Sequence, residues 1–426
     1  MIKNPSKLTI NDDIRSVLTI LDEGLESSKP SIHLQKFFLK NNIQLQNSRI
    51  ILNNYDRKFL IAIGKSAGRM AEYVSKKIPL TRGIVIVPKG VKPKLKKPKF
   101  EIIYAGHPLP NQNSLRAGKK LVHLINQTQT NDFVIFLVSG GGSTLAVLPD
   151  SISLKEKTLV NERLIRSGAN INEIACVRKH LSLIKGGRLI ANMPCKGISF
   201  LISDVIGDDI GSISSGISYY DKTSYKDALK VVKKFSLQNK LPKNVLSILN
   251  SGASGKIPET PKKPRIKNIV VLKNSMCLSA MKEKSKKLGY NTIVIPNITG
   301  NVNYVANKLA ITASYRKTNC IIFGGEPTVN VIGGGKGGRN QELVLRIYEK
   351  LKTKKNNYIV ASIGTDGIDG NTKFAGAITS TELIHETKNY LKNNNSSSFF
   401  KKFGGLIETG ITQNNVNDIG IILRRN

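Results

Sequence analysis

The sequence predicts an α/β fold in which parallel strands alternate with helices in two domains. Apolar, β-rich runs repeatedly end in glycine and are followed by helix-like periodicity, which is the pattern of strand–turn–helix units. A chain of 426 residues with 40% hydrophobic content is longer than one compact unit usually is. Proline, glycine, serine and lysine cluster at residues 251–265, so we expect a boundary near Pro258 that separates domains at 1–258 and 265–426.

The first strand–turn–helix unit spans residues 59–74. FLIAI is a short strand, and Gly64 is the turn that follows it. Ala67, Met70 and Val74 then recur at the spacing of a helix that faces a core. Similar units lie at residues 132–144, 198–209, 320–329 and 358–370. Because open parallel sheets bind ligands at the carboxyl ends of their strands, we expect these glycine-rich turns to converge on one crevice.

Composition and charge limit the classes of protein that fit. The chain has no apolar run of about 18 residues and no secretory signal pattern, so we expect a cytoplasmic protein without a membrane partner. Its four cysteines are too scattered for a disulfide framework. The net charge of +37 attracts phosphates and nucleic acids alike, but no nucleic-acid-binding module is present. We therefore expect the charge to steer anionic substrates rather than to bind specific nucleic acid.

Lys65 and Ser66 follow the first predicted strand, in the segment IGKSAG. This segment resembles the end of a P-loop, but Phe59 stands where that motif needs a glycine. A lysine on the first turn of a helix still combines its ammonium group with free backbone N–H groups, so Lys65 is a candidate anion ligand. Ser66 is a candidate for contact with the substrate. A surface lysine at a tight turn is an equally good interpretation of this segment alone.

Residues 139–143, which we call the SGGGS turn, follow a second predicted strand and open a helix. Successive N–H groups in such a turn favour an anion-binding nest. The G-x-G-x-x-G order of dinucleotide-binding proteins fails at Leu145, which argues against a nicotinamide cofactor. Glycines needed only for close packing of helix on strand are the alternative. The candidate phosphate ligands are Ser139, Gly140, Gly141, Gly142 and Ser143.

A helix is predicted from Asn170, which forms a capping-box pattern with Glu173, as far as the Gly-Gly pair that follows Lys185. Arg178, Ser182 and Lys185 fall on one polar stripe of that helix. Arg178 and Lys185 are therefore candidate substrate ligands. Cations that merely offset the dipole at the end of a helix are the alternative.

Carboxylates follow three of the predicted strands, in the segments SDVIGDD, GGEPT and GTDGIDG. Their oxygens suit a magnesium ion that is itself bound to phosphates. Carboxylates at turns often only form the turn. The candidate metal ligands are Asp204, Asp208, Glu326 and Asp366, with Asp209 and Asp369 as neighbours in the same segments.

Residues 333–339, which we call the GGGKGGR loop, contain five glycines and precede a helix that Asn340 is expected to cap. A glycine-rich backbone can approach a ligand closely, and Lys336 and Arg339 add charge where a helix N-terminus already favours anions. The candidate phosphate ligands here are Gly335, Lys336, Gly337, Gly338 and Asn340. We expect residues 393–398, NNNSSS, to form a mobile loop without chemistry.

Eight segments occur in a fixed order along nearly the whole chain: IGKSAGRM, GHPLPN, SGGGST, VRKHLSLIKGGRL, SDVIGDD, GGEPTV, GGKGGRNQEL and GTDGIDG. Together they resemble the glycerate 2-kinase family with the MOFRL C-terminal domain. The resemblance implies that the γ-phosphoryl group of ATP passes, with a divalent ion such as Mg²⁺, to D-glycerate and gives 2-phosphoglycerate. It implies catalytic roles for Lys65 and Arg339.

The same resemblance implies a large Rossmann-like N-terminal domain, a smaller α/β C-terminal domain and an active site in the cleft between them. The final residues are expected to pack back on the first domain. Several positions depart from the family pattern: Gly370, Asn371, Thr372 and Lys373 replace GPTD, Ile206 replaces a proline, and residues 215–218 and 409–418 differ from SGPT and TGPTGTNVND. These changes concern metal coordination and the substrate, and leave Lys65 and Arg339 in place.

Two other functions are open at this stage. A hydroxypyruvate reductase would use a closely related three-carbon acid, but the missing dinucleotide spacing opposes it. A basic nucleic-acid-binding protein would rest on charge alone. The oligomeric state, the phosphoryl donor and the choice between the 2- and 3-hydroxyl groups do not follow from the residues.

Overall fold

The computed structural model describes residues 1–96, 98–315, 318–382 and 385–425. It forms two compact units, Pro30–Val271 and the combination of Met1–Lys29 with Leu272–Asn426. We call the first the parallel-sheet unit and the second the mixed-sheet unit. These units differ from the expected domains at both ends, because the first 29 residues join the second unit and the crossover lies after Val271 rather than near Pro258.

The parallel-sheet unit is built on a six-stranded sheet with the order β6-β5-β4-β7-β8-β9. The neighbouring pairs from β6 to β8 run parallel. Strand β4 lies between β5 and β7, and the chain adds strands in opposite directions from it, so the topological switch point lies at the ends of β4 and β7. The strands are β4 (Lys58–Ile63), β5 (Arg82–Pro88), β6 (Phe100–Ala105), β7 (Phe133–Val138), β8 (Lys196–Ile202) and β9 (Lys267–Leu272).

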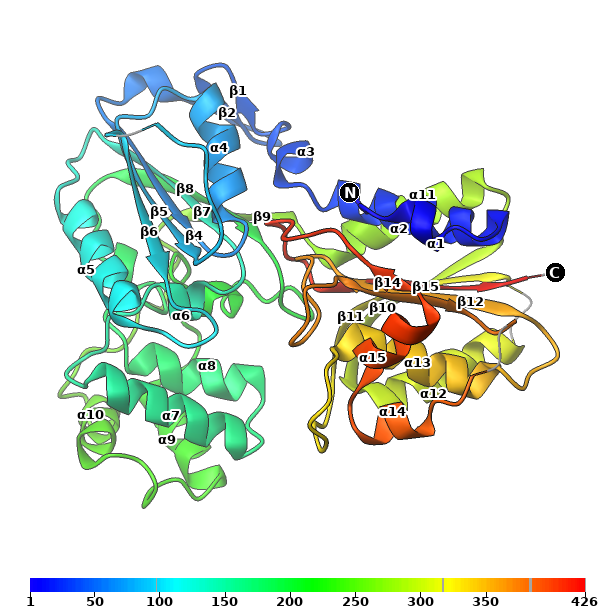
Figure 1. Ribbon diagram of the computed structural model, residues 1–426. Helices are drawn as coiled ribbons and strands as arrows, with labels where there is room; N and C mark the ends of the chain where they lie inside the picture. Colours follow the sequence, from blue (N-terminus) through cyan, green and yellow to red (C-terminus); the bar gives the residue numbers. More distant parts are fainter. Residues whose placement is uncertain (97, 316–317, 383–384, 426) are drawn as a thin grey trace. The chain divides into compact units, whose positions relative to one another are not determined.

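Strand β7 shows why this sheet forms, because all six of its residues, FVIFLV, are buried. Such a continuous apolar run is typical of a parallel strand covered on both faces. Figure 1 shows α7 to α10 gathered beyond one end of the sheet, where they enclose a second apolar cluster. The helices of the unit are α3 (Pro30–Leu34), α4 (Ala67–Lys77), α5 (Gln112–Asn126), α6 (Gly142–Leu145), α7 (Leu154–Arg166), α8 (Ile171–His180), α9 (Tyr225–Lys234) and α10 (Lys243–Ala253).

Short elements complete the parallel-sheet unit. A small antiparallel sheet contains β1 (Phe38–Leu39), β2 (Asn42–Gln44) and β3 (Arg49–Ile51). Three 3₁₀ turns are η1 (Leu52–Asn54), η2 (Arg188–Ile190) and η3 (Ile213–Ser215). The proline-rich segment 251–265, where we expected the domain boundary, packs against the rest of this unit at its centre. Thr260 is buried, and the carbonyl of Pro261 accepts a hydrogen bond from the N–H of Asp221.

The mixed-sheet unit has a six-stranded sheet with the order β10-β11-β15-β12-β13-β14. Only β10 and β11 pair in parallel, and β15 runs antiparallel between β11 and β12. The final strand therefore lies inside this sheet, and it also packs on α2, whose residues the expected first domain contained. The strands are β10 (Thr292–Asn301), β11 (Cys320–Thr328), β12 (Tyr358–Gly364), β13 (Gly376–Ser380), β14 (Leu406–Ile407) and β15 (Asp418–Arg424).

Helix α2 explains why the N-terminal residues belong to the mixed-sheet unit. Gly24 lies so close to Ile419 and Met281 that an added Cβ would come within 2.8 Å of both side chains. Figure 1 shows α2 beside α11 on one face of this sheet, while α12 and α13 cover the other face. The helices are α1 (Pro5–Leu8), α2 (Asp12–Ser27), α11 (Asn274–Lys287), α12 (Val302–Tyr315), α13 (Arg339–Leu351), α14 (Lys388–Lys392) and α15 (Ser396–Phe403).

Residues 393–398 are ordered by their contacts, which corrects the expected mobile loop. Ser396 and Ser397 are buried at the start of α15. All four cysteines are free and buried. Within the part of the chain that the structure describes, no helix has the length and apolar character needed to cross a lipid bilayer.

Candidate active site

The turns after β4 and β7 interlock at the switch point of the parallel sheet. The N–H of Lys65 donates to the carbonyl of Gly140 at 2.9 Å, and the N–H of Ser66 donates to Ser139 Oγ at 3.0 Å. A Cβ on Gly64 would lie 2.2 Å from Ser139 Oγ, so only glycine fits there. The structure therefore brings Lys65 and Ser66 together with the SGGGS turn, as the strand pattern predicts.

The SGGGS turn presents N–H groups that the protein itself does not use. Among the described residues, the N–H groups of Gly140, Gly141, Gly142 and Ser143 form no hydrogen bond. Gly141 has a left-handed backbone with φ of 86°, and α6 begins at the next residue. Unpaired N–H groups at the start of a helix attract anions through partial positive charge. The turn thus has the chemistry of an oxyanion-binding nest.

Lys185 supports this turn from within the protein. Its Nζ donates to the carbonyl of Gly142 at 2.9 Å and to the carbonyl of Ser214 at 3.2 Å. Ser214 Oγ in turn donates to the carbonyl of Ser139 at 2.8 Å, and the hydroxyl groups of Ser143 and Ser215 lie 2.8 Å apart. Lys185 is only 1% exposed, so it braces the SGGGS turn and does not project into solvent.

The expected helical stripe of Arg178, Ser182 and Lys185 is wrong. Helix α8 begins with the expected capping box at Asn170, but it ends at His180. Ser182 instead pairs with Pro149 in a β-bridge, so the chain turns away before Lys185. Arg178 remains on the helix, where its Nε donates to Asn161 Oδ1 at 2.6 Å.

The carboxylates after β8 form a turn of their own in the parallel-sheet unit. Asp204 and Asp208 are half-buried, and Asp208 has a left-handed backbone with φ of 57°. Asp209 is more exposed and accepts a hydrogen bond from Ser212 Oγ at 2.7 Å. Asp209 also lines a cavity of about 210 Å³ together with Lys179 and Asp221.

The GGGKGGR loop differs from the SGGGS turn because four of its N–H groups, those of Gly333, Gly335, Lys336 and Gly337, are already bonded within the described protein. Gly333 donates to Asn394 Oδ1, and Gly335 donates to the carbonyl of Asn393. Further along, Lys336 donates to Asn395 Oδ1 and Gly337 to Asn371 Oδ1. The NNNSSS segment therefore holds the loop in place. Local sequence patterns do not show this structural role, because the loop and the segment that holds it lie about 60 residues apart in the chain.

Asp369 caps helix α13, so the expected cap at Asn340 is wrong. Asn340 lies inside the helix, and its N–H and that of Gln341 donate to the Asp369 carboxylate at 3.0 and 2.9 Å. The helix N-terminus that was expected to attract a phosphate thus already contacts a carboxylate. Burial raises the pKa of Asp369 to about 6, although these N–H groups act in the opposite direction.

Arg339 is held by two carboxylates at the start of α13. Its Nε and Nη2 donate to the two oxygens of Asp418 at 2.6 and 3.0 Å, and its Nη1 lies 3.0 Å from Glu326 Oε1. Burial disfavours the charged guanidinium, but Asp418 outweighs this effect and raises the pKa of Arg339 above its usual range. A bidentate pair fixes the plane of the guanidinium group.

Asp418 is a site residue that the sequence reasoning missed. Its partner on β11 is Gly325 and its partner on β12 is Gly364, so it lies between the carboxyl ends of two strands. A Cβ on Gly364 would lie 3.3 Å from Asp366 Oδ1 and 3.5 Å from Asp418 Oδ1, which places both acids beside that strand end. The only signal was the final NVND segment, residues 415–418, which keeps the family pattern although residues just before it differ.

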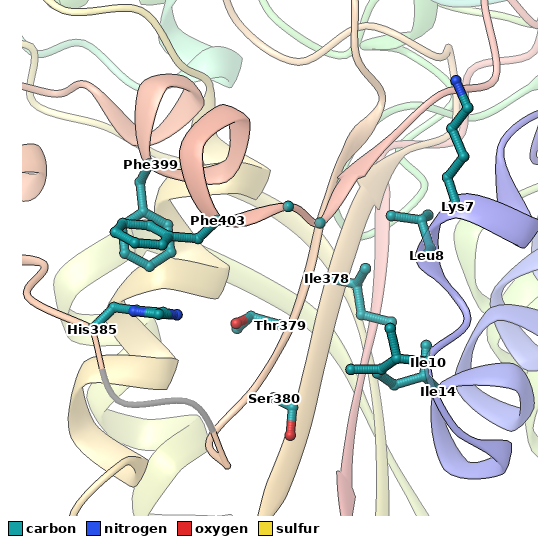
Figure 2. A pocket seen from close by; sticks show the side chains of 12 residues that line it. Lys7, Leu8, Ile10, Ile14, Ile378, Thr379, Ser380, His385, Phe399 and Phe403 are labelled. Carbon is teal, nitrogen blue, oxygen red and sulfur yellow. The ribbon is translucent and has the colours of Figure 1, made fainter.

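Two pockets in the mixed-sheet unit differ in their chemistry. One of about 150 Å³ lies among α1, α2, β13 and α15, where Figure 2 shows Ile14, Ile378, Phe399 and Phe403 around it. It contains none of the candidate residues. The other, of about 280 Å³, is lined by the GGGKGGR loop, Arg339 and Asn371. Only the second pocket adjoins candidate site residues.

These features define a class: an α/β protein of two units with a turn of backbone N–H groups, left unpaired by the described residues, at the switch point of a parallel sheet. A family model described as a domain of unknown function (DUF4147) matches residues 16–250, and the MOFRL family model matches residues 319–418. A glycerate 2-kinase of Pyrococcus horikoshii is 32% identical over 437 residues, which cover 96% of this chain and 97% of that protein. A D-glycerate 2-kinase of Thermotoga maritima is 37% identical, with 87% and 92% covered.

Solved structures agree with these relatives. A crystal structure of a glycerate kinase from Thermotoga maritima matches with a TM-score of 0.82 and 32% identity, over 97% of this chain and 100% of that one. A crystal structure of a Pyrococcus horikoshii protein matches with a TM-score of 0.79 and 31% identity, over 97% and 99%. The chain therefore belongs to the glycerate 2-kinase family with the MOFRL domain, which confirms the resemblance seen in the sequence.

Proposed function

We propose that this protein is a glycerate 2-kinase, a phosphotransferase that moves the γ-phosphoryl group of ATP to D-glycerate. The observation that carries the proposal is the SGGGS turn, whose free N–H groups lie beside Lys65 in a chain with full-length glycerate 2-kinase relatives. Phosphoryl transfer needs mainly positioning and stabilisation of charge, and these groups supply both. The reaction is proposed to take place in the cytoplasm, with no specific nucleic acid or membrane as partner.

The proposed roles follow the geometry of each unit. In the parallel-sheet unit, Ser139, Gly140, Gly141, Gly142 and Ser143 bind phosphate oxygens through their backbone, and Lys65 neutralises the charge that builds up during transfer. Ser66 and Arg178 contact the substrate, and Lys185 acts by bracing the turn. In the mixed-sheet unit, Arg339 supplies a second cation. Lys336 adds charge, while Gly335, Gly337, Gly338 and Asn340 shape the loop and the helix start that hold these cations.

Magnesium is part of the proposal, and it supplies charge neutralisation on the nucleotide phosphates when it is bound. The described residues contain no cluster of three or more acidic, histidine or cysteine side chains arranged for a metal ion. They fit Mg²⁺ only in the manner of nucleotide enzymes, where one or two carboxylates join the substrate phosphates. Asp204, Asp208 and Asp366 are the proposed ligands. Glu326 fits less well because it already pairs with Arg339.

The test is an assay with D-glycerate and Mg-ATP. We expect ADP formation that depends on glycerate, and a product that enolase consumes directly, because enolase accepts 2-phosphoglycerate. A product phosphorylated at the 3-hydroxyl would support the glycerate kinase activity but would show that the 2-hydroxyl is not the target. No ADP formation with D-glycerate would overturn the proposal.

A further inference from the structure

Three cations lie together in the parallel-sheet unit, close to the SGGGS turn. Lys157 on α7 is only 5% exposed, and Lys185 is 1% exposed. Arg178 on α8 bonds to Asn161, which lies one helical turn after Lys157 on the same face of α7. This bond holds Arg178 against the face of α7 that carries Lys157. Lys185 joins them to the turn through its bond to the carbonyl of Gly142.

These cations lack the acidic partner that buried charges normally have. The side-chain Nζ of Lys157 forms no hydrogen bond or ion pair among the described residues, and no carboxylate contributes to the pKa of any of the three groups. Burial lowers the pKa of Lys157 to about 8, with a further contribution from Arg178. Burial also lowers the pKa of Lys185, and both neighbouring cations act in the same direction. Buried charges of one sign repel one another unless an opposite charge joins them.

We propose that Lys157 and Arg178 form a subsite for a compact oxyanion, a carboxylate or a phosphoryl group, with Lys185 as the positioning residue that links this subsite to the SGGGS turn. An oxyanion neutralises the repulsion and accepts hydrogen bonds from the unused donors of Lys157 and Arg178. The proposal extends the proposed function by assigning a new residue, Lys157, to the recognition of a substrate anion. The oxyanion belongs either to the three-carbon acid or to the nucleotide.

The first test measures anion binding without turnover, so it does not depend on the kinase assignment. Inorganic phosphate is titrated while the thermal unfolding midpoint is recorded for the wild type, Lys157→Met and Lys155→Met. Lys155 is a matched control because it is exposed on the same helix. We expect a saturable rise in the midpoint for the wild type and the control, and its loss in Lys157→Met. Lys157→Arg should restore it.

The second test identifies the source of the oxyanion. If the subsite holds the three-carbon acid, Lys157→Met should raise the KM for D-glycerate at least about tenfold and leave the KM for ATP unchanged. If it holds the nucleotide, the KM for ATP should rise instead. Arg178→Met provides an independent variant on the second helix.

An equal phosphate response in Lys157→Met and the wild type, with both KM values unchanged, would overturn the subsite. Absence of glycerate kinase activity in the wild type would instead reject the proposed function, because the phosphate titration would still report on the cations. Lys157→Met removes a like charge from the cluster, so its unfolding midpoint without phosphate should not fall below that of the wild type.

Discussion

The SGGGS turn and the GGGKGGR loop have similar compositions and opposite hydrogen bonding. In the SGGGS turn, the N–H groups of residues 140–143 are unused by the described residues. The side chains of Lys185 and Ser214 donate hydrogen bonds to the carbonyl groups of the turn. In the GGGKGGR loop, asparagines and Asp369 accept bonds from the N–H groups of the loop and of the helix that follows. The first segment has backbone donors that an external oxyanion can use, and the second has acceptors supplied by the protein itself.

This difference in hydrogen bonding shows that glycine content alone does not identify a phosphate-binding loop. What matters is whether the backbone donors have partners inside the protein. In the GGGKGGR loop, the glycines allow close approach of other protein segments: a Cβ on Gly338 would lie 2.2 Å from Asp369 Cγ. The proposed functional group of that loop is then the side chain of Arg339.

The largest expected effect comes from removing the cation of either segment, Lys65 beside the SGGGS turn or Arg339 at the end of the GGGKGGR loop. Lys65→Met and Arg339→Ala should each lower kcat by at least about 100-fold, because each removes a group that stabilises developing charge. Steady-state kinetics with D-glycerate and Mg-ATP measure this effect. Lys76→Met, at an exposed position near the end of α4, should change kcat less than about twofold. Near-normal turnover in both cation variants would contradict the assignment.

Adding a methyl group to one glycine of each segment tests whether the two segments differ in their effect on nucleotide binding. Gly141→Ala forces a side chain onto a left-handed backbone and places its Cβ 3.0 Å from the ring of His107. We expect the KM for ATP to rise about tenfold or more, since the N–H nest must distort. Gly334→Ala meets nothing within 4 Å and should change KM less than about twofold. Equal effects of the two substitutions would remove the distinction between the segments.

The partners of the GGGKGGR loop provide a smaller and separate effect. Asn394→Ala removes an acceptor that the N–H groups of Ile332 and Gly333 share at the start of the loop, and the free energy of unfolding should fall by about 1–3 kcal/mol. Chemical denaturation measures the change. Asn393→Ala is the control, because its contact with the loop is made by the backbone carbonyl, which the substitution leaves in place. If both variants unfold alike, the asparagine side chains do not hold the loop.

A separate expected effect is a change in the pH dependence of stability. The pKa of Asp369 is about 6 in the folded protein, above its value of about 3.9 in an unfolded chain. Its contribution is therefore fully present below about pH 4 and is lost as the pH rises through 6. Relative to Asp369→Asn, the wild type should lose up to about 3 kcal/mol of unfolding free energy between pH 4 and 7. Parallel pH profiles of the two proteins would contradict this.

Local features of the sequence predicted the parallel-sheet side of the site. The turn at Gly64, the SGGGS turn and the capping box at Asn170 all depend on residues close together in the chain, so their patterns are sufficient. The α/β fold class is confirmed for the same reason. The prediction for the helix beyond His180 was wrong because a long-range contact, the bridge between Ser182 and Pro149, overrides local periodicity.

The mixed-sheet side depended on partners that local patterns cannot show. Arg339 and Asp418 are 79 residues apart, and Asp369 caps a helix that begins 30 residues earlier. The asparagines at residues 393–395 resemble a flexible segment, because nothing close in the sequence shows that their oxygen atoms accept hydrogen bonds from the GGGKGGR loop. Lys157 gave no signal at all, because a lysine on an amphipathic helix usually lies in solvent.

Hydrogen exchange at the two glycine segments, with and without Mg-ADP, directly tests whether the SGGGS turn, rather than the GGGKGGR loop, supplies free N–H groups to the nucleotide. Without ligand, the amides of residues 140–143 should exchange fast, while those of Gly335, Lys336 and Gly337 should already be protected by their partners. Mg-ADP should slow exchange in the SGGGS turn and change the GGGKGGR loop little. Fast exchange in the GGGKGGR loop that slows with nucleotide, beside an unchanged SGGGS turn, would contradict the account.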